Sequence, residues 1–466
     1  MLFSSPVFFL FFLIYFVLHL LLPLRFRLPL IIAGSAIFYS YWNPYYLWLP
    51  FVIMWLAYRG TIWMEESTEP AIKRRRLTGV VIALLIPLLL VKYTNFLYQD
   101  VLGALLGFSG PLVDWKLPLG ISFITFTLIA YVVDVYAGRY RLERNPKMLA
   151  GLVLFFPHLI AGPILRPSEL LPQLHRPKRS VGVLAIFGIA IFSVGLLKKL
   201  VFADPMSEVV NHVFDPNTVN LSGGEYLLSI YGFALQIYCD FSGYTDMAIG
   251  TAILLGVSLP TNFQRPYAAT SVVEFWNRWH ITLSKWLRDY LYIPLGGNRA
   301  GYRQQAINLF ITMTLGGLWH GANWTFVIWG MSHGAGISVV HATRRFTVLR
   351  WLGRMPRLLK VLITFHFVAA CWILFRAPNL HTAWRVASGP FVAPWTDSMP
   401  FVEQHIFPLV LLAVFFVTHR WDDHRTVRAI TQKMPKALFW PALVLIWVLA
   451  ITVSQGSSAK FIYFDF

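Results

Sequence analysis

The stretch MLFSSPVFFLFFLIYFVLHLLLP (residues 1–23) decides the fold, because it is apolar almost throughout and contains no Asp, Glu, Lys or Arg. A membrane-spanning helix needs about 20 consecutive apolar residues, whereas a strand of a membrane barrel alternates apolar and polar residues. Backbone polar groups in lipid must also be satisfied internally. The continuous run therefore predicts a transmembrane helix.

Runs of this kind recur along the whole chain. We predict spans at about 3–22, 29–43, 46–64, 77–91, 117–136, 181–200, 226–256, 361–376, 405–418 and 438–454. Two further segments, about 149–165 and 305–340, contain prolines or glycines and are predicted to be re-entrant or broken. The sequence thus indicates an all-α polytopic membrane protein with about ten to twelve transmembrane helices, plus re-entrant and amphipathic helices.

The composition agrees with a membrane protein. Of the 466 residues, 57% are hydrophobic and 13% are charged, whereas soluble domains carry about 25% charged residues. The net charge of +18 arises in short loops between apolar runs, which is typical of positive-inside topology rather than of nucleic-acid binding. Two cysteines, Cys239 and Cys371, are too few for a disulfide framework or a zinc site.

Loop charge also predicts the orientation in the membrane. Most of the 39 Lys and Arg residues fall in clusters at 25–27, 73–76, 139–147, 166–179, 265–303, 344–360 and 420–436. All seven clusters lie on one side, the cytoplasm, if the two broken segments do not cross completely. Basic residues follow the first apolar run rather than precede it, which favours an uncleaved anchor over a signal peptide. Both termini are then expected outside.

The string GGLWHGANW (residues 316–324) places a histidine in an apolar region. His320 follows the basic cluster ending at Arg303 by about 24 Å of helical rise, which is near mid-bilayer. The glycines permit a helix break, Trp319 and Trp324 are expected to supply rigid walls, and Asn323 offers an amide nearby. A neutral imidazole in a dry site can act as a general base. The alternative is a buried histidine bonded to a backbone carbonyl.

The string SVVEFWNRWHITLSKWLRDYLYIP (residues 271–294) combines apolar residues at three- and four-residue steps with charged ones. This spacing predicts an amphipathic helix that lies on the cytoplasmic face or dips inward. His280 and Trp276 are candidate site residues here, and an interfacial histidine packed among tryptophans is the alternative. His280 and His320 are too far apart in sequence for a metal pair on one helix, and no HExxH motif occurs. We therefore predict no metal site.

The string QIYCDFSGYTDMAIG (residues 236–250) sets two carboxylates, Asp240 and Asp246, within an apolar run. Gly243 between them predicts a locally broken helix that lines a polar cavity. The carboxylates are candidates for orienting a histidine or binding a substrate hydroxyl. Hydrogen bonding between helices is the alternative. The serine of this string does not lie in a G-x-S-x-G motif, because the local sequence is Asp-Phe-Ser-Gly-Tyr. The glycine pair of IPLGGNRAGYR (residues 293–303) lacks the order of a nucleotide P-loop.

Several strings, in this order along nearly the whole chain, resemble the bacterial branch of the membrane-bound O-acyltransferase family. They are LPLGISFITF (117–126), FFPHLIAGPILRP (155–167), DFSGYTDMAIG (240–250), NFQRPY (262–267), FWNRWHITLSKWLRDYLYIPLGGNR (275–299), LGGLWHGANWTFVIWG (315–330) and FIYFDF (461–466). The two strings that carry His280 and His320 are the most specific.

The resemblance implies a helical core in which an outer and an inner funnel meet at the active-site histidine, His320, with His280 as the second family histidine. It also implies a thioester donor on the cytoplasmic side, either acetyl-coenzyme A or an acyl carrier protein, and no bound cofactor. The acceptor is then a hydroxyl of an extracytoplasmic polysaccharide or of a partner protein. We expect acetyl as the acyl group, with D-alanyl transfer from an acyl carrier protein as the alternative.

The expected setting follows from the same resemblance. We predict one membrane domain over 1–466, divided into N-terminal helices (1–136), a catalytic core (149–345) and C-terminal helices (357–466), in the inner membrane of a bacterium. Expected partners are membrane lipid, a periplasmic acyltransferase or small membrane acceptor protein, and an acyl carrier protein if it is the donor; no nucleic acid is expected. From another class, a lipid or polysaccharide-precursor transporter is the alternative, but no repeats support it.

Overall fold

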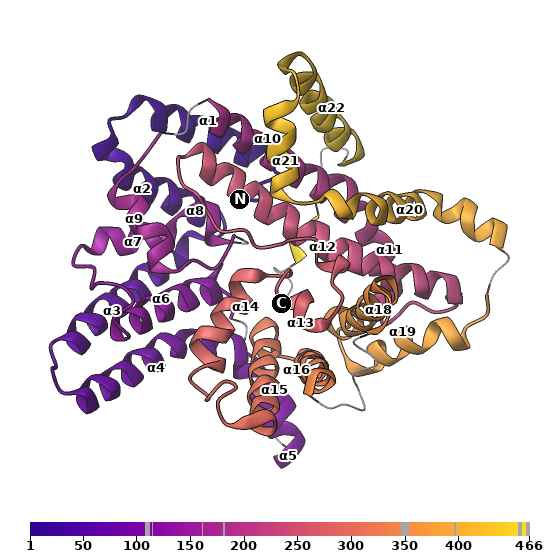
Figure 1. Ribbon diagram of the computed structural model, residues 1–466, viewed down its shortest axis with the longest axis horizontal. Coiled ribbons are helices and arrows are strands. Elements are labelled where there is room, and N and C mark those ends of the chain that lie inside the picture. Colours follow the sequence, from indigo (N-terminus) through magenta and orange to yellow (C-terminus); the bar gives the residue numbers. More distant parts are fainter. Residues whose placement is uncertain are drawn as a thin grey trace. The chain divides into compact units, whose positions relative to one another are not determined.

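A computed structural model describes residues 1–107, 112–113, 115–160, 162–179, 182–345, 354–395, 398–454 and 459–462. It is 78% helical and has no strand among these residues, so the all-α prediction is confirmed (Figure 1). Within the described residues, six helices are long and apolar enough to cross a membrane. The chain divides into two compact units, residues 1–192 with 247–260 and residues 193–246 with 261–466.

The first unit contains the N-terminal helices. They are α1 (Pro6–Leu21), α2 (Arg27–Ser40), α3 (Trp48–Glu65), α4 (Pro70–Asn95), α5 (Ala104–Leu106), α6 (Ile121–Tyr136), α7 (Pro146–Leu154), α8 (Phe156–Leu159), α9 (Pro167–His175) and most of α10 (Val183–Leu197). Helix α1 begins where the Ser5 side chain accepts a hydrogen bond from the Phe8 N–H, which is a normal N-cap. Helices α3, α4 and α6 pack against one another.

Helix α6 is almost completely buried. Its start requires a glycine at position 120, where φ is +66° and an added Cβ would lie 2.5 Å from the carbonyl oxygen of Leu159. Both the left-handed backbone and the close approach exclude a larger side chain. The glycine of the LPLGISFITF string therefore sets the contact between α6 and the end of α8.

The second unit contains the remaining helices. They are α11 (Asp204–Phe214), the first part of α12 (Gly223–Leu254), α13 (Val272–Trp276), α14 (Ile281–Leu287), α15 (Gly301–His320), α16 (Trp324–Arg345), α18 (Arg357–Arg376), α19 (Leu380–Val392), α20 (Ser398–Thr418), α21 (His424–Lys433) and α22 (Lys436–Ser454). The π-helical segment η4 (Lys198–Ala203) precedes α11.

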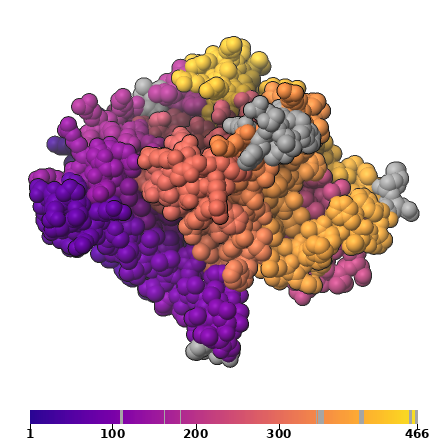
Figure 2. Space-filling view, turned by 60° about the horizontal axis from the view of Figure 1, so that its bottom comes forward, coloured from indigo at the N-terminus to yellow at the C-terminus, as the bar shows by residue number. Residues whose placement is uncertain are grey.

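All ten predicted spans coincide with helices, and the two segments predicted to be broken are broken. In the first, residues 149–154 belong to α7 and residues 156–159 form α8, with Phe155 between the two helices; in the second, residues 305–340 belong to the pair α15 and α16. These two helices pack side by side, and Figure 2 shows their residues as a continuous surface in orange tones. The larger span count, the orientation in the membrane and the single-domain organisation remain predictions.

Candidate functional site

His320 is the last residue of α15, at the point where the chain turns into α16. The helix ends because Gly321 leaves the helical conformation. The imidazole is 4% exposed and meets three aromatic rings, with ring centres 4.8 Å away in Trp319, 5.1 Å in Trp329 and 5.3 Å in Phe375. All three contacts are edge-to-face. The histidine therefore lies in an aromatic enclosure at the end of a helix.

Glycines determine how closely α15 and α16 approach each other. An added Cβ at Gly317 would lie 2.2 Å from the carbonyl oxygen of Phe326, and one at Gly330 would lie 2.3 Å from the carbonyl oxygen of Met313. These distances are too short for any side chain, so backbone meets backbone along the pair. The glycines before His320 therefore position it by close packing of the two helices.

His280 lies between the short helices α13 and α14 and is fully buried. The prediction of one continuous amphipathic helix is wrong here. Residues 277–280 form a turn, and His280 has a left-handed backbone with φ of 41°, which costs a non-glycine residue about 1–3 kcal/mol. Most apolar residues of the pattern are nevertheless buried as expected, namely Phe275, Trp276, Trp279, Leu283, Trp286 and Leu287, whereas Leu291 is half-buried. The break directs the histidine into this core.

The hydrogen bond between His280 and Asn262 assigns the tautomer of the imidazole. Asn262 Oδ1 accepts the Thr282 backbone N–H at 3.2 Å and the Thr282 hydroxyl at 2.9 Å. Because a backbone N–H only donates, the atom that it meets must be the amide oxygen. His280 Nδ1 lies 3.2 Å from the same oxygen and therefore carries the hydrogen. The basic nitrogen of His280 is Nε2.

The protonation state of His280 follows from its burial. His280 lies outside the six candidate spans, and burial lowers the pKa of its imidazole to about 3. Loss of water penalises the charged form of a histidine. The imidazole is therefore neutral at physiological pH and keeps a lone pair on Nε2.

Trp319 brings the two predicted histidines into one cluster. Its ring centre lies 4.8 Å from that of His320 and 6.5 Å from that of His280. Trp276 contacts Trp329 at 5.8 Å between ring centres and donates its indole N–H to His333 Nδ1 at 3.2 Å. Four predicted site residues thus belong to one buried aromatic cluster, which holds the neutral imidazole of His280. Such a site can accept a proton while excluding water.

Asn323 lies in the turn between α15 and α16, beside this cluster. Its Oδ1 accepts the Thr325 N–H at 2.9 Å, and its Nδ2 donates to the Pro378 carbonyl at 3.0 Å. The side chain therefore satisfies the start of α16 and joins the turn to the loop after α18. Its predicted contact with substrate remains a prediction.

Asp240 and Asp246 lie on one unbroken helix, so the predicted break at Gly243 is wrong. Helix α12 runs through 32 residues from Gly223 to Leu254. Gly243 instead allows close packing, because an added Cβ would lie 2.7 Å from the carbonyl oxygen of Gly195. A glycine within an apolar run is compatible with either a kink or a close approach, and tertiary packing selected the second.

The two carboxylates pair with buried lysines of η4. Lys199 Nζ lies 2.7 Å from Asp240 and 2.8 Å from Asp204. Lys198 Nζ lies 2.8 Å from Asp246 and 2.6 Å from Asp422. Buried charges need such partners because desolvation is costly. We call these two lysines and four aspartates the ion-pair cluster. Its carboxylates are paired with lysines, so their predicted role toward substrate remains a prediction.

Asp240 also anchors the C-terminal segment. The Ile462 N–H donates to Asp240 Oδ2 at 2.7 Å, and the Phe461 ring is 1% exposed. Phe461 lies 5.8 Å from Phe241 between ring centres, and Phe241 meets His280 edge-on at 4.8 Å. The ion-pair cluster thus secures a segment that packs behind His280. The end of the FIYFDF string, residues 463–466, lies outside the described residues.

Sequence reasoning missed several members of this site. Asn262 begins the string NFQRPY, but nothing in the string showed that its amide would meet His280. Lys198 and Lys199 could have been found, because two lysines inside an apolar run are costly unless they are paired. Trp329 and Phe375 come from α16 and α18, and only the packing of those helices brings them to His320.

Comparison with known proteins points to one family. The model of the membrane-bound O-acyltransferase family matches residues 145–376, which include both site histidines. A probable alginate O-acetylase, AlgI, of Pseudomonas putida is 40% identical over the full length of both chains.

Two other relatives act on different polymers according to their names. A peptidoglycan O-acetyltransferase of Helicobacter pylori is 38% identical over 79% of this chain and 74% of its own. A teichoic acid D-alanyltransferase of Bacillus subtilis is 28% identical over 56% of this chain and 69% of its own. The O-acetyl-transferring relatives are thus more similar to this chain than the D-alanyl-transferring one.

Proposed function

The chain belongs to the membrane-bound O-acyltransferase family, and from this premise we propose that it transfers acetyl groups across a bacterial inner membrane. It is a membrane O-acyltransferase that uses an acyl donor as cosubstrate. The proposal adds a cytoplasmic thioester donor and an extracytoplasmic hydroxyl acceptor, on a polysaccharide or on a partner protein. Acetyl is favoured because the relatives named for O-acetyl transfer are the more similar ones.

His320 acts as the general base in this reaction. Its imidazole takes the proton from the acceptor hydroxyl while that oxygen attacks the thioester carbonyl carbon. The carbon–sulfur bond then breaks, the acyl group stays on the acceptor oxygen, and the thiolate leaves and takes up the proton. The aromatic enclosure around His320 keeps water away from the thioester. Removal of such a base lowers rates by about two to four powers of ten.

His280 orients the donor or completes a proton path. The observation that carries the two-histidine proposal is the position of Trp319, which contacts both imidazoles. Asn262 holds the hydrogen on His280 Nδ1, so Nε2 offers a lone pair to a donor group or to a proton. Trp276, Trp319 and Asn323 are proposed to line the substrate channel, with Asp240 and Asp246 fixing the helices around it.

The donor is recognised through basic residues near His280. The segment 265–303 carries Arg265, Arg278, Lys285 and Arg288, of which Arg288 is largely exposed. Cationic groups of this kind attract the phosphates of acetyl-coenzyme A and the acidic surface of an acyl carrier protein alike. D-alanyl transfer from a carrier protein is the second candidate, favoured by the Bacillus subtilis relative. Family membership favours either enzyme over a precursor transporter. A periplasmic acyltransferase or a small membrane acceptor protein is the proposed partner outside.

The test compares His320→Ala with His381→Ala in purified protein supplied with a polysaccharide as hydroxyl acceptor and with acetyl-labelled coenzyme A or, separately, an acetylated carrier protein. His381 is exposed on α19 and provides the matched histidine control. We expect His320→Ala to abolish cleavage of the thioester and His381→Ala to retain it. Full activity of His320→Ala at normal abundance would overturn the proposed role. Cleavage of only one donor identifies the thioester that the enzyme uses.

A further inference from the structure

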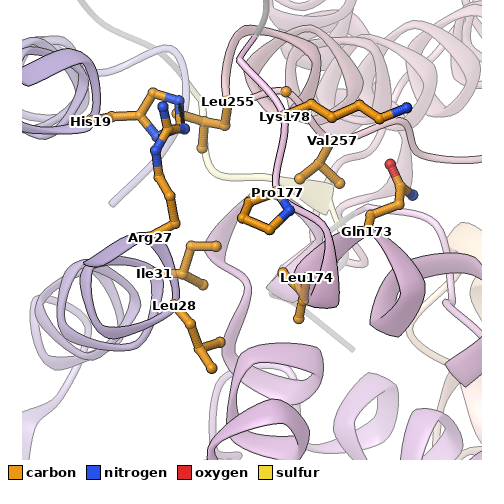
Figure 3. Close-up of a pocket in the computed structure, with 11 residues that line it drawn as sticks. His19, Arg27, Leu28, Ile31, Gln173, Leu174, Pro177, Lys178, Leu255 and Val257 are labelled. Carbon is orange, nitrogen blue, oxygen red and sulfur yellow. Dashed lines mark hydrogen bonds between the residues drawn. The ribbon is translucent and has the colours of Figure 1, made fainter. Parts of the chain in front are cut away.

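The first unit contains a small cavity that the proposed reaction does not use. It has a volume of about 20 Å³ and is lined by α1, α2, the end of α9 and the segment after α12. Figure 3 shows Arg27 reaching from α2 toward His19, with Leu174, Pro177 and Val257 across the cavity. Among the eleven lining residues, two are cations, Arg27 and Lys178, and none is a carboxylate.

Arg27 is the feature that requires an explanation. Arg27 is only 3% exposed, and its Nη1 lies 2.7 Å from His19 Nδ1. Its Nε and Nη2 find no hydrogen-bond acceptor among the described residues. A guanidinium cannot give up its proton in a protein and presents donors only. A buried cation with unused donors is costly without an anion.

The neighbouring polar groups do not supply that anion. The Gln173 amide donates to the carbonyls of Glu169 and Ser258, at 2.6 and 2.9 Å, and accepts the Ser258 N–H at 2.9 Å. Its hydrogen-bonding capacity is used to hold the wall of the cavity. Arg179 lies next to Lys178 in the chain and donates to the Leu22 carbonyl at 3.5 Å. The surroundings of Arg27 are therefore basic or already committed.

We propose that this cavity binds a phosphate group, with one phosphate oxygen held by Arg27 and the remainder beside the exposed Lys178 at the mouth. A volume of about 20 Å³ admits one group of the size of a water molecule, which suits a single phosphate oxygen. Charge-assisted bonds from a guanidinium to phosphate are short and strong. The first turn of α2, which begins at Arg27, adds partial positive charge.

The phosphate can come from a phospholipid headgroup or from solution, and the apolar surroundings favour the lipid. Leu28, Ile31 and Leu174 line the cavity, and the chain between α1 and α2 exposes Leu21, Leu24 and Phe26. The two basic clusters that meet here, 25–27 and 166–179, are predicted on the cytoplasmic side. Anionic lipids attract such clusters at that surface.

The experiment measures thermal unfolding of the full-length protein in a phosphate-free maltoside detergent. Dioleoyl phosphatidylglycerol, dioleoylglycerol and inorganic phosphate are added separately. We expect phosphatidylglycerol to raise the melting temperature and dioleoylglycerol, which has the same acyl chains without phosphate, to have little effect. A similar increase with inorganic phosphate assigns the site to a soluble anion. No increase with either phosphate source overturns the proposal.

Two variants and one control connect the effect with the cavity. Arg27→Gln should weaken the apparent affinity for phosphatidylglycerol about tenfold or more, since a charged hydrogen bond is lost. Lys178→Gln changes an exposed residue, so it tests the site without risk to folding, and a few-fold loss is expected. Arg25→Gln removes the same charge from an exposed residue outside the cavity and should respond like wild type. Wild-type responses of Arg27→Gln and Lys178→Gln would also overturn the proposal.

Discussion

At the scale of single residues, the chemistry of His280 depends on its neighbour Asn262. The Asn262 oxygen accepts hydrogen bonds from Thr282 and from the imidazole at once. This arrangement fixes both the ring orientation and the tautomer, and the left-handed backbone at His280 is maintained by the packing around it. The hydrogen bond at Nδ1 thus leaves Nε2 as the nitrogen that is available for the reaction.

Replacement of Asn262 tests this dependence. We expect Asn262→Leu to lower kcat about tenfold or more with little change in KM, because the tautomer and orientation of His280 are no longer fixed. Asn262→Asp retains an acceptor oxygen and should keep much more of the activity. Steady-state rates of thioester cleavage provide the measurement. Equal activity of both variants and wild type would contradict the role of Asn262.

At the scale of elements, the hairpin of α15 and α16 places His320. Ridges of side chains normally keep helices 8–10 Å apart. Here the glycines of α15 and α16 allow backbone atoms of the two helices to touch. The turn at Gly321 ends α15 directly after His320, so the position of the imidazole depends on the spacing of the two helices. The rigidity of the site therefore comes from these glycines.

The glycine at position 317 provides a test of this spacing. Gly317→Ala should destabilise the protein by about 1–3 kcal/mol, as overpacked interiors do, and should lower activity by moving His320. Gly79→Ala in α4 is the matched control, because an added Cβ there meets no atom within 4 Å and alanine favours helix. Thermal melting in detergent and thioester cleavage are measured together. If Gly317→Ala changed neither the melting temperature nor the rate of thioester cleavage, the spacing of the two helices would not matter for stability or activity.

The ion-pair cluster joins several elements of the second unit. Lys198 and Lys199 of η4 bind carboxylates from α11, α12 and the segment before α21. Lys199 also donates to the Lys460 carbonyl at 3.3 Å. The buried lysines and aspartates stabilise the protein only while all of them are present. Removal of any one leaves an opposite charge buried without a partner.

Removal of one lysine should therefore be more harmful than removal of a pair. Lys199→Met is expected to cost about 3 kcal/mol or more, seen as a lower melting temperature. Lys199→Met combined with Asp240→Asn should recover part of that loss. Lys436→Met, at an exposed position, serves as the control and should be neutral. A double variant no better than Lys199→Met would contradict the pairing.

At the scale of the whole molecule, loop charge predicts the orientation in the membrane. Both native cysteines are free and buried, so labelling of introduced cysteines has a low background. We expect Asn217→Cys, in the predicted outer loop between α11 and α12, to react with an impermeant maleimide in intact cells. Arg75→Cys, in a predicted cytoplasmic cluster, should react only after permeabilisation. The reverse pattern would overturn the predicted topology.

Much of the fold could be predicted because helices in lipid must satisfy their own backbone. Ten apolar runs therefore corresponded to ten helices. The failures occurred where tertiary packing selects between local conformations. Gly243 marked a close approach rather than a break, and the pattern at 271–294 concealed the turn at His280. The spacing of apolar residues predicts which side chains are buried, but it does not predict whether the helix that carries them is continuous.

The sequence by itself determined that this chain is helical, spans a membrane and carries two histidines in strings typical of its family. These properties follow from local apolar length and from residue identity. Only the tertiary structure decided that Trp319 lies between the two histidines, that Asn262 sets the tautomer of His280, and that Asp240 and Asp246 pair with Lys199 and Lys198. The physical reason is that these contacts join residues far apart in the chain, and helix packing, which no local pattern specifies, brings them together.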